Sequence, residues 1–173
     1  AVMSAQSSCE EMYLFQKILR DIGISNIDHR SKECNFKYQD KYPVIPSFDI
    51  KLSEIESMEN IILVNVNISK EFPILSIYLR NAVKQNSTNI ISLSAYEYLE
   101  NFDISHSETL SPKELEKYFT TTSNNILLNI NKDKKNLIIM GPSTTYLKNY
   151  SNIMNNISRY AKSINSKLSL LGD

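Results

Sequence analysis

The sequence predicts an α/β fold with three layers, in which a mostly parallel sheet carries helices on both faces. The short, almost continuously apolar run at residues 61–66 is typical of a strand buried on both sides of a parallel sheet. Further strands are predicted at 89–93 and 137–140. Each is followed by a turn and then by helical or polar sequence, and strands that alternate with helices form parallel neighbours. A fourth strand is predicted at 26–29. We expect residues 1–173 to form a single lobe.

The clearest βα unit spans residues 61–80. Asn67 can cap a helix after the strand, and Pro73 has no N–H to donate, so it is tolerated only in the first helical turn. The pattern predicts a helix at 71–85, apolar around most of its circumference and therefore buried on more than one side. The loop lies at the carboxyl end of the strand, where open α/β sheets bind ligands, but it has no glycine to cradle a pyrophosphate.

Three other helices are predicted from caps and periodicity. Ser8 begins a capping-box pattern that leads to a stop at Gly23, and Ser111 begins a second one with a proline at the first helical position. Apolar residues recur at helical spacing through 147–164. A further strand begins near Leu168.

Two segments are less regular, and two helices have predicted core positions. The connection 30–50 contains prolines that disfavour helix, and a loop of this length is usually functional or packed against a neighbour. Segment 124–130 has a composition that favours a strand and a position that favours a short helix. Leu75 and Tyr150 are expected to be core positions of their helices.

Composition excludes several functions. The chain has 19 basic and 19 acidic side chains, so no net field favours nucleic acid or an anionic bilayer. No apolar run approaches the ~20 residues that span a membrane. Cys9 and Cys34 are the only cysteines, and an iron–sulfur cluster needs about four thiolates. We therefore expect two unpaired thiols in a reducing cytoplasm and no cluster in this segment.

Few residues are candidates for a site. Residues 141–143 combine a glycine, a hydroxyl and a helix start, a minimal anion site, but Pro142 removes one N–H donor and favours a purely structural turn. His29 and His106 have no metal-ligand spacing, and His106 is expected in a polar loop. The sequence therefore predicts no catalytic, cofactor-binding or metal-ligating residue in this segment.

Several motifs occur in the order of a known family. They are Asn67-x-x-x-Glu71-x-Pro73-x-Leu75 continuing to Leu79-Arg80, Ser7-Ser8-Cys9-Glu10-Glu11, Asn26-Ile27-Asp28-His29-Arg30, Ile50 to Glu56, and Leu137 to Gly141. From about Ser7 to Asp173 the chain resembles the large iron–sulfur subunit of bacterial NADH–quinone oxidoreductase (respiratory complex I). The similar region is the carboxy-terminal part of that subunit, which is built like a molybdopterin oxidoreductase.

The resemblance implies a lobe like those of formate dehydrogenase and DMSO reductase, and a non-catalytic structural role in a complex that passes electrons from NADH to quinone and pumps protons. It implies 2Fe-2S and 4Fe-4S clusters elsewhere in a longer chain, and other peripheral-arm subunits as partners. The location would be the cytoplasmic side of the bacterial inner membrane, without direct insertion. Glu71, Pro73 and Arg80 match the family pattern. We expect them to provide, respectively, a helix start, a helix entry and a buried or interfacial ion pair.

Two alternatives differ in chemistry. The chain could be a cofactor-binding fragment of an active molybdopterin oxidoreductase, or a stand-alone α/β enzyme that binds a small anion at 141–143. Active enzymes of this architecture ligate the metal through Cys, selenocysteine, Ser or Asp, and hold the dinucleotide cofactor with glycine-containing turns. The loops after Met3, Val66 and Leu93 contain no glycine, which favours a relative that kept the fold and lost the cofactor.

Overall fold

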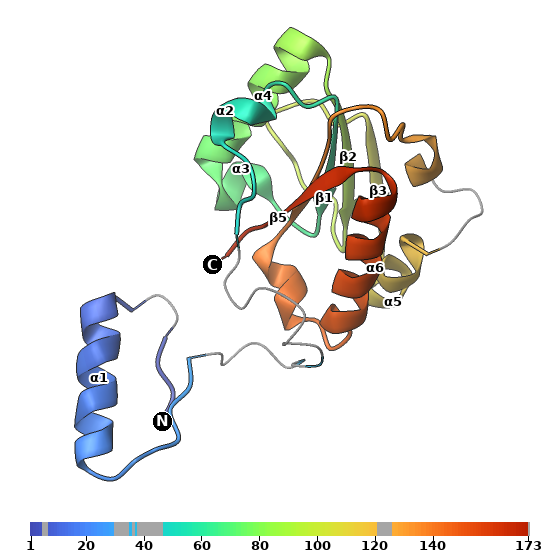
Figure 1. The fold of residues 1–173 in the computed structure, drawn as a ribbon. Helices are drawn as coiled ribbons and strands as arrows, with labels where there is room; N and C mark the ends of the chain where they lie inside the picture. The colour runs from blue at the N-terminus through green and yellow to red at the C-terminus, as the bar shows by residue number, and fades with distance from the viewer. Residues whose placement is uncertain (5–6, 30–34, 36, 38–46, 121–125, 173) are drawn as a thin grey trace.

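The computed structural model describes residues 1–4, 7–29, 35, 37, 47–120 and 126–172 (Figure 1). The helices and strands follow the order α1 (Cys9–Asp21), α2 (Leu52–Ile55), β1 (Asn60–Val64), α3 (Ile68–Glu71), α4 (Pro73–Asn86), β2 (Asn89–Ser94), β3 (His106–Thr109), α5 (Pro112–Tyr118), η2 (Ile126–Asn129), β4 (Asn136–Met140), η3 (Pro142–Tyr146), α6 (Tyr150–Ser163) and β5 (Ser166–Leu170). None of the described helices is long and apolar enough to cross a membrane.

The five strands form one sheet in the order β3-β2-β1-β4-β5, and all four neighbouring pairs are parallel. Ile61 and Leu63 of β1 point into a core that α2 and α4 cover. Ile62 and Val64 point into the opposite core, under α5 and α6. Because β1, β2 and β4 are covered on both faces, nearly every side chain in them is buried. The predicted three-layer parallel α/β fold is confirmed.

Four of the five strands of the sheet were predicted, one predicted strand is absent from it, and the edge strand β3 was missed. β1, β2 and β4 confirm the runs at 61–66, 89–93 and 137–140, and β5 confirms the strand near Leu168. The strand at 26–29 was wrong, since Asp28 makes only an isolated parallel bridge with Val2. β3 was missed because it is polar and lies at the edge, where it pairs with β2 alone.

The predicted helix at 71–85 corresponds to α4, which begins at Pro73, a residue that has no N–H to donate. A short helix that was not predicted, α3, precedes it and ends at Glu71. Leu75 is buried, with 5% of its surface exposed, but Ile74 and Ile77 are 65% and 59% exposed. Burial on more than one side was therefore wrong for the described part of the chain, in which the outer face of α4 is uncovered.

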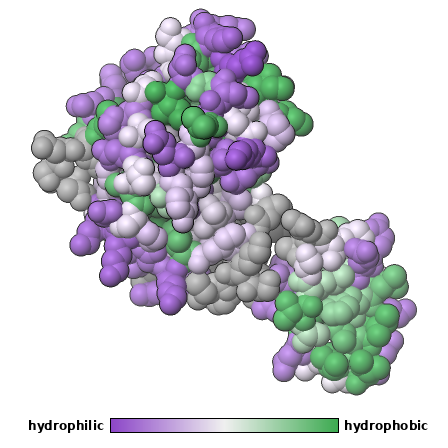
Figure 2. All heavy atoms as spheres, turned by 180° about the vertical axis from the view of Figure 1, so that it is seen from behind, coloured by the Kyte–Doolittle hydropathy of each residue, from purple (hydrophilic) through white to green (hydrophobic). Residues whose placement is uncertain are grey.

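Helix α1 also exposes apolar side chains. Its capping box at Ser8 is present as predicted, but none of its residues is buried. The large exposed side chains on it and just after it are Tyr13, Leu14, Ile18 and Ile22. Figure 2 shows apolar atoms gathered on one face of this segment. That residues 1–173 form a single lobe stays a prediction.

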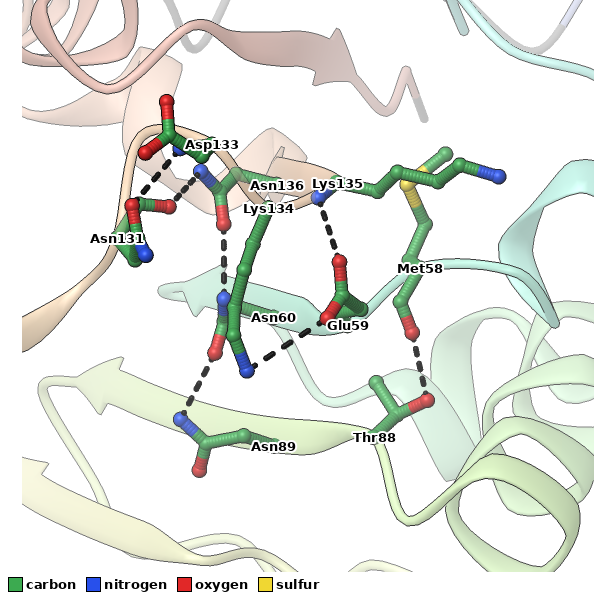
Figure 3. A network of polar contacts seen from close by, with 10 residues as sticks. All are labelled: Met58, Glu59, Asn60, Thr88, Asn89, Asn131, Asp133, Lys134, Lys135 and Asn136. Atoms are coloured by element: carbon green, nitrogen blue, oxygen red, sulfur yellow. Dashed lines mark hydrogen bonds and ion pairs between the residues drawn. The ribbon is translucent and has the colours of Figure 1, made fainter.

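At the amino ends of β1, β2 and β4, which we call the amino edge of the sheet, asparagine side chains form hydrogen bonds from strand to strand (Figure 3). Asn60 Nδ2 donates to Asn136 Oδ1 at 2.8 Å, and Asn89 Nδ2 donates to Asn60 Oδ1 at 3.3 Å. Asn136 Nδ2 also donates to the carbonyl oxygens of Asn131 and Ile164, both at 2.9 Å. The three asparagines occupy matching register positions on β2, β1 and β4. Polar groups at this edge are thus satisfied across the strands, which helps to fix their register.

Two irregular segments are only partly described. Segment 124–130 forms a 3₁₀ helix at Ile126–Asn129, which agrees with the short-helix alternative, while 124 and 125 lie outside the described residues. Most of connection 30–50 also lies outside them. At its end, the carbonyl oxygen of Ser47 accepts a hydrogen bond from the N–H of Leu170 at 2.8 Å.

We predict that Leu75→Ala destabilises the protein far more than Lys148→Ala. Leu75 lies on the buried face of α4 and is almost fully enclosed by the core, so its truncation should cost about 2–5 kcal/mol. Lys148 is exposed, and its truncation should cost under about 0.5 kcal/mol. Chemical denaturation of both variants measures the difference, and equal losses would show that the buried face of α4 is assigned wrongly. Tyr150, by contrast, is only partly buried against its core.

Candidate functional site

The candidate site lies at the carboxyl ends of the parallel strands, between β1 and β4. We call this side of the sheet the carboxyl edge. The chain passes from β1 to β2 on one side and later adds β4 on the other side of β1. Ligands of open α/β sheets bind at such a switch point, outside the carboxyl ends of the strands, because the loops there diverge. Here the two loops begin at Asn65 and Gly141.

Asn65 joins three strand ends. Its backbone is left-handed, with φ of 49°, a conformation that asparagine adopts more readily than most residues. Its N–H donates to Leu93 O of β2 at 2.8 Å, and its Oδ1 accepts from the N–H of Ala95 at 3.3 Å. Its Nδ2 donates to Ser143 Oγ at 3.0 Å, and the Ser143 hydroxyl donates back to Asn65 O at 2.7 Å. These bonds close the switch point with the chain's own groups.

Gly141 allows the two loops to touch. A Cβ at this position would lie 2.5 Å from Asn65 O and 2.6 Å from Val66 Cβ, closer than real Cβ atoms approach other atoms. The N–H of Gly141 donates to Val64 O at 2.9 Å. The glycine therefore serves close packing of one loop on the other, which supports the interpretation of residues 141–143 as a structural turn.

The backbone N–H groups after β1 are also occupied. Each N–H of residues 67–70 donates to a side chain of the same chain. The bonds run from Asn67 N to Glu71 Oε1 (3.3 Å), Ile68 N to Glu100 Oε1 (2.8 Å), Ser69 N to Glu100 Oε2 (2.7 Å) and Lys70 N to Asn67 Oδ1 (3.3 Å). Such groups at a strand–helix turn are the usual donors to a phosphate, so none of the four is left to bind one.

Two carboxylates lie near Tyr98 in the loop that follows β2. Burial raises the pKa of Tyr98, and the charges of Glu71, Tyr96 and Glu100 raise it further.

Two buried hydroxyls at this edge have no hydrogen-bond partner among the described residues. They are Ser94 Oγ at the end of β2 and Thr144 Oγ1 in η3. Their side chains are enclosed, with 2% and 0% of their surface exposed. A ligand could reach them only if the surrounding loops moved.

The three family-matched residues do not form one cluster of reactive groups. Glu71 is exposed and bonds the N–H of Asn67, while Pro73 is the first residue of α4. Arg80 is exposed and has no ion pair with a carboxylate in the described part of the chain. The described part of the chain therefore contains no buried ion pair with Arg80. An ion pair between Arg80 and another protein stays a prediction.

The histidines and cysteines are dispersed. His29 is exposed, with its Nδ1 3.7 Å from Asp28 Oδ1. His106 begins β3, so the polar loop expected there was wrong, and its Nε2 lies 3.3 Å from Glu108 Oε1. Cys9 is an exposed free thiol, and Cys34 lies outside the described residues. Within the described ranges, no three His, Cys, Asp or Glu side chains are grouped to hold a metal.

The strand order defines the class of fold. It is an α/β lobe with an open, all-parallel sheet and a switch point between β1 and β4. Residues 1–169 match the family model for molybdopterin oxidoreductase, so the chain belongs to that family. No curated protein matches the sequence.

A solved structure with a similar fold is a chain of the formyltransferase/hydrolase complex from Methylorubrum extorquens, determined with methylofuran. It is 10% identical, with a TM-score of 0.61 over 99% of this chain and 52% of that chain. At this identity the similarity shows the fold alone. This chain spans about half the length of that one.

The family implies a pterin dinucleotide cofactor, but the described residues at this edge do not fit one. The donors after β1 bond Glu71, Asn67 and Glu100, and the space beside Gly141 holds the chain's own backbone. Sequence reasoning missed Asn65 and Glu100. An asparagine directly after a buried strand was a usable signal for a left-handed turn, whereas Glu100 had no local signal because its partners lie more than 30 residues away.

We predict that Gly141→Ala destabilises the protein while Ser94→Ala does not. The new Cβ must displace the backbone of Asn65, and such overpacking costs about 1–3 kcal/mol. Removing the Ser94 hydroxyl, which lacks a partner among the described residues, should be neutral or slightly stabilising. Thermal unfolding compares the two, and a large loss in Ser94→Ala would show that this hydroxyl has a partner in solution.

Proposed function

We propose that this chain is a non-catalytic structural lobe of the large iron–sulfur subunit of NADH–quinone oxidoreductase (complex I). In this role it positions the cluster-bearing part of its subunit and passes no electrons itself. The main observation that supports this proposal is the packing at the switch point, where Asn65 and Ser143 bond each other and Gly141 lies against the backbone of Asn65. Family membership over residues 1–169 supports the molybdopterin-oxidoreductase-like architecture that such a lobe requires.

Exposed apolar surface supports a role within an assembly. Ile74 and Ile77 on α4 and the α1 face of Tyr13, Leu14 and Ile18 are open to solvent in the described structure. Apolar patches of this kind often mark contacts with other proteins. The partners would be other peripheral-arm subunits, on the cytoplasmic side of the bacterial inner membrane, with 2Fe-2S and 4Fe-4S clusters in the rest of the subunit.

The alternative is a cofactor-binding fragment of an active molybdopterin oxidoreductase. Family membership and the two buried hydroxyls of Ser94 and Thr144 favour it, since a cofactor could use such groups if the loops opened. A stand-alone enzyme with an anion at 141–143 has less support, because the Ser143 hydroxyl is engaged by Asn65.

Cofactor analysis separates the first two functions. We predict that the full-length subunit, purified with its clusters, contains iron but neither molybdenum nor fluorescent pterin in stoichiometric amount, because the edge that would hold the cofactor is filled. Elemental analysis and pterin fluorescence after oxidation measure this. One equivalent of molybdenum and pterin would select the alternative.

We predict that Arg80→Ala lowers the amount of assembled complex and leaves the turnover of each assembled complex near normal. Arg80 is exposed on α4, so a partner carboxylate could meet it at an interface. Removing one member of a buried pair costs about 3–5 kcal/mol. Lys84→Ala, which removes an exposed cation from the same helix, is the control.

The measurement is NADH–quinone turnover per assembled complex, with assembly quantified separately. Normal assembly with lost turnover would show a direct role in electron transfer and rule out the scaffold function.

A further inference from the structure

The connection between β2 and β3, residues 95–105, contains no helix. It runs back along the face of the sheet that α4 covers. It leaves the carboxyl end of β2 and returns to the amino end of β3, because the two strands are parallel. Phe102 and Ile104 anchor it in the same core as α4. We call residues 95–105 the strap.

Glu100 of the strap binds the turn after β1. Its two carboxylate oxygens accept the N–H groups of Ile68 and Ser69 at 2.8 and 2.7 Å, and the Ser69 hydroxyl also donates to it. An anion that accepts successive backbone N–H groups and a hydroxyl at a strand–helix turn has the bonding that proteins give to phosphate oxygens. Here the anion is a side chain of the protein.

Asn101 adds a second attachment beside the first. Its N–H donates to Ser69 Oγ at 3.0 Å, and its Oδ1 accepts from the hydroxyl of Ser76 at 2.5 Å. Ser76 lies on α4 and is fully buried. The strap is therefore held at two adjacent residues, on α3 and α4 together.

We propose that Glu100 is a built-in ligand of the turn after β1, and that the strap closes this part of the sheet edge to phosphorylated cofactors. The inference deepens the proposed function, on which it rests. A phosphate at this turn would have to displace the Glu100 carboxylate from both N–H groups. It would also lie beside that carboxylate and Glu71, and the like charges would repel it.

The first test is hydrogen exchange measured by mass spectrometry on the protein that carries this chain. Glu100→Gln removes the charge and replaces one acceptor oxygen with an NH2 group, which cannot accept a hydrogen bond from a backbone N–H. Amide exchange of Ile68 and Ser69 should therefore become at least about tenfold faster. Glu97→Gln removes the same charge from an exposed position of the strap and should leave these two residues unchanged. Unchanged exchange in Glu100→Gln would overturn the proposal.

The second test uses the unmodified protein, so it does not depend on how a variant folds. Inorganic pyrophosphate stands in for the diphosphate of the cofactor, and exchange of residues 67–70 is measured with and without it. We expect no change, and increased protection of these residues would overturn the proposal. That result would leave the scaffold function standing unless molybdenum and pterin are also found, so the two failures are distinguishable.

Discussion

The left-handed turn at Asn65 is the constraint on which the carboxyl edge depends. A φ of 49° is unfavourable for most residues, but it turns the chain sharply at the end of β1. The side chain then reaches Ser143 after β4 and the N–H of Ala95 after β2. One residue thus ties together the loops of three adjacent strands, and Gly141 is required because Asn65 O occupies the place of its Cβ.

The two edges of the sheet are closed by the same principle. At the amino edge, Asn60, Asn89 and Asn136 satisfy one another across the strands. At the carboxyl ends of the strands, Asn65 donates to Ser143, and the Glu100 carboxylate accepts the N–H groups of Ile68 and Ser69. Buried polar groups need hydrogen-bond partners. For these side chains the described partners are other residues of the same chain. The family's architecture is retained, and the described loops at the carboxyl ends of β1 and β4 pack against each other.

The outer surfaces differ from these closed edges. Apolar side chains of α1, and Ile74 and Ile77 on α4, remain exposed in the described structure. Helices with exposed apolar side chains are suited to contact with other protein surfaces. This exposed apolar surface, together with the resemblance to one component of a large complex, is why we favour a structural role over catalysis.

Local sequence determined the central elements. β1, β2 and β4 were predictable because strands buried on both faces are mostly apolar. The start of α4 was predictable because Pro73 lacks an N–H. The same local signals identified the capping boxes at Ser8 and Ser111.

Tertiary structure decided the rest. β3 is polar and is a strand only because β2 accepts it as an edge partner, whereas 26–29 has no described partner beyond one bridge. Because α4 is apolar around most of its circumference, its sequence did not show which apolar side chains would stay exposed to solvent. The closed site depends on pairs distant in sequence, Asn65 with Ser143 and Glu100 with Ile68 and Ser69. No periodicity or cap encodes such pairs, because only the packing of the sheet brings them together.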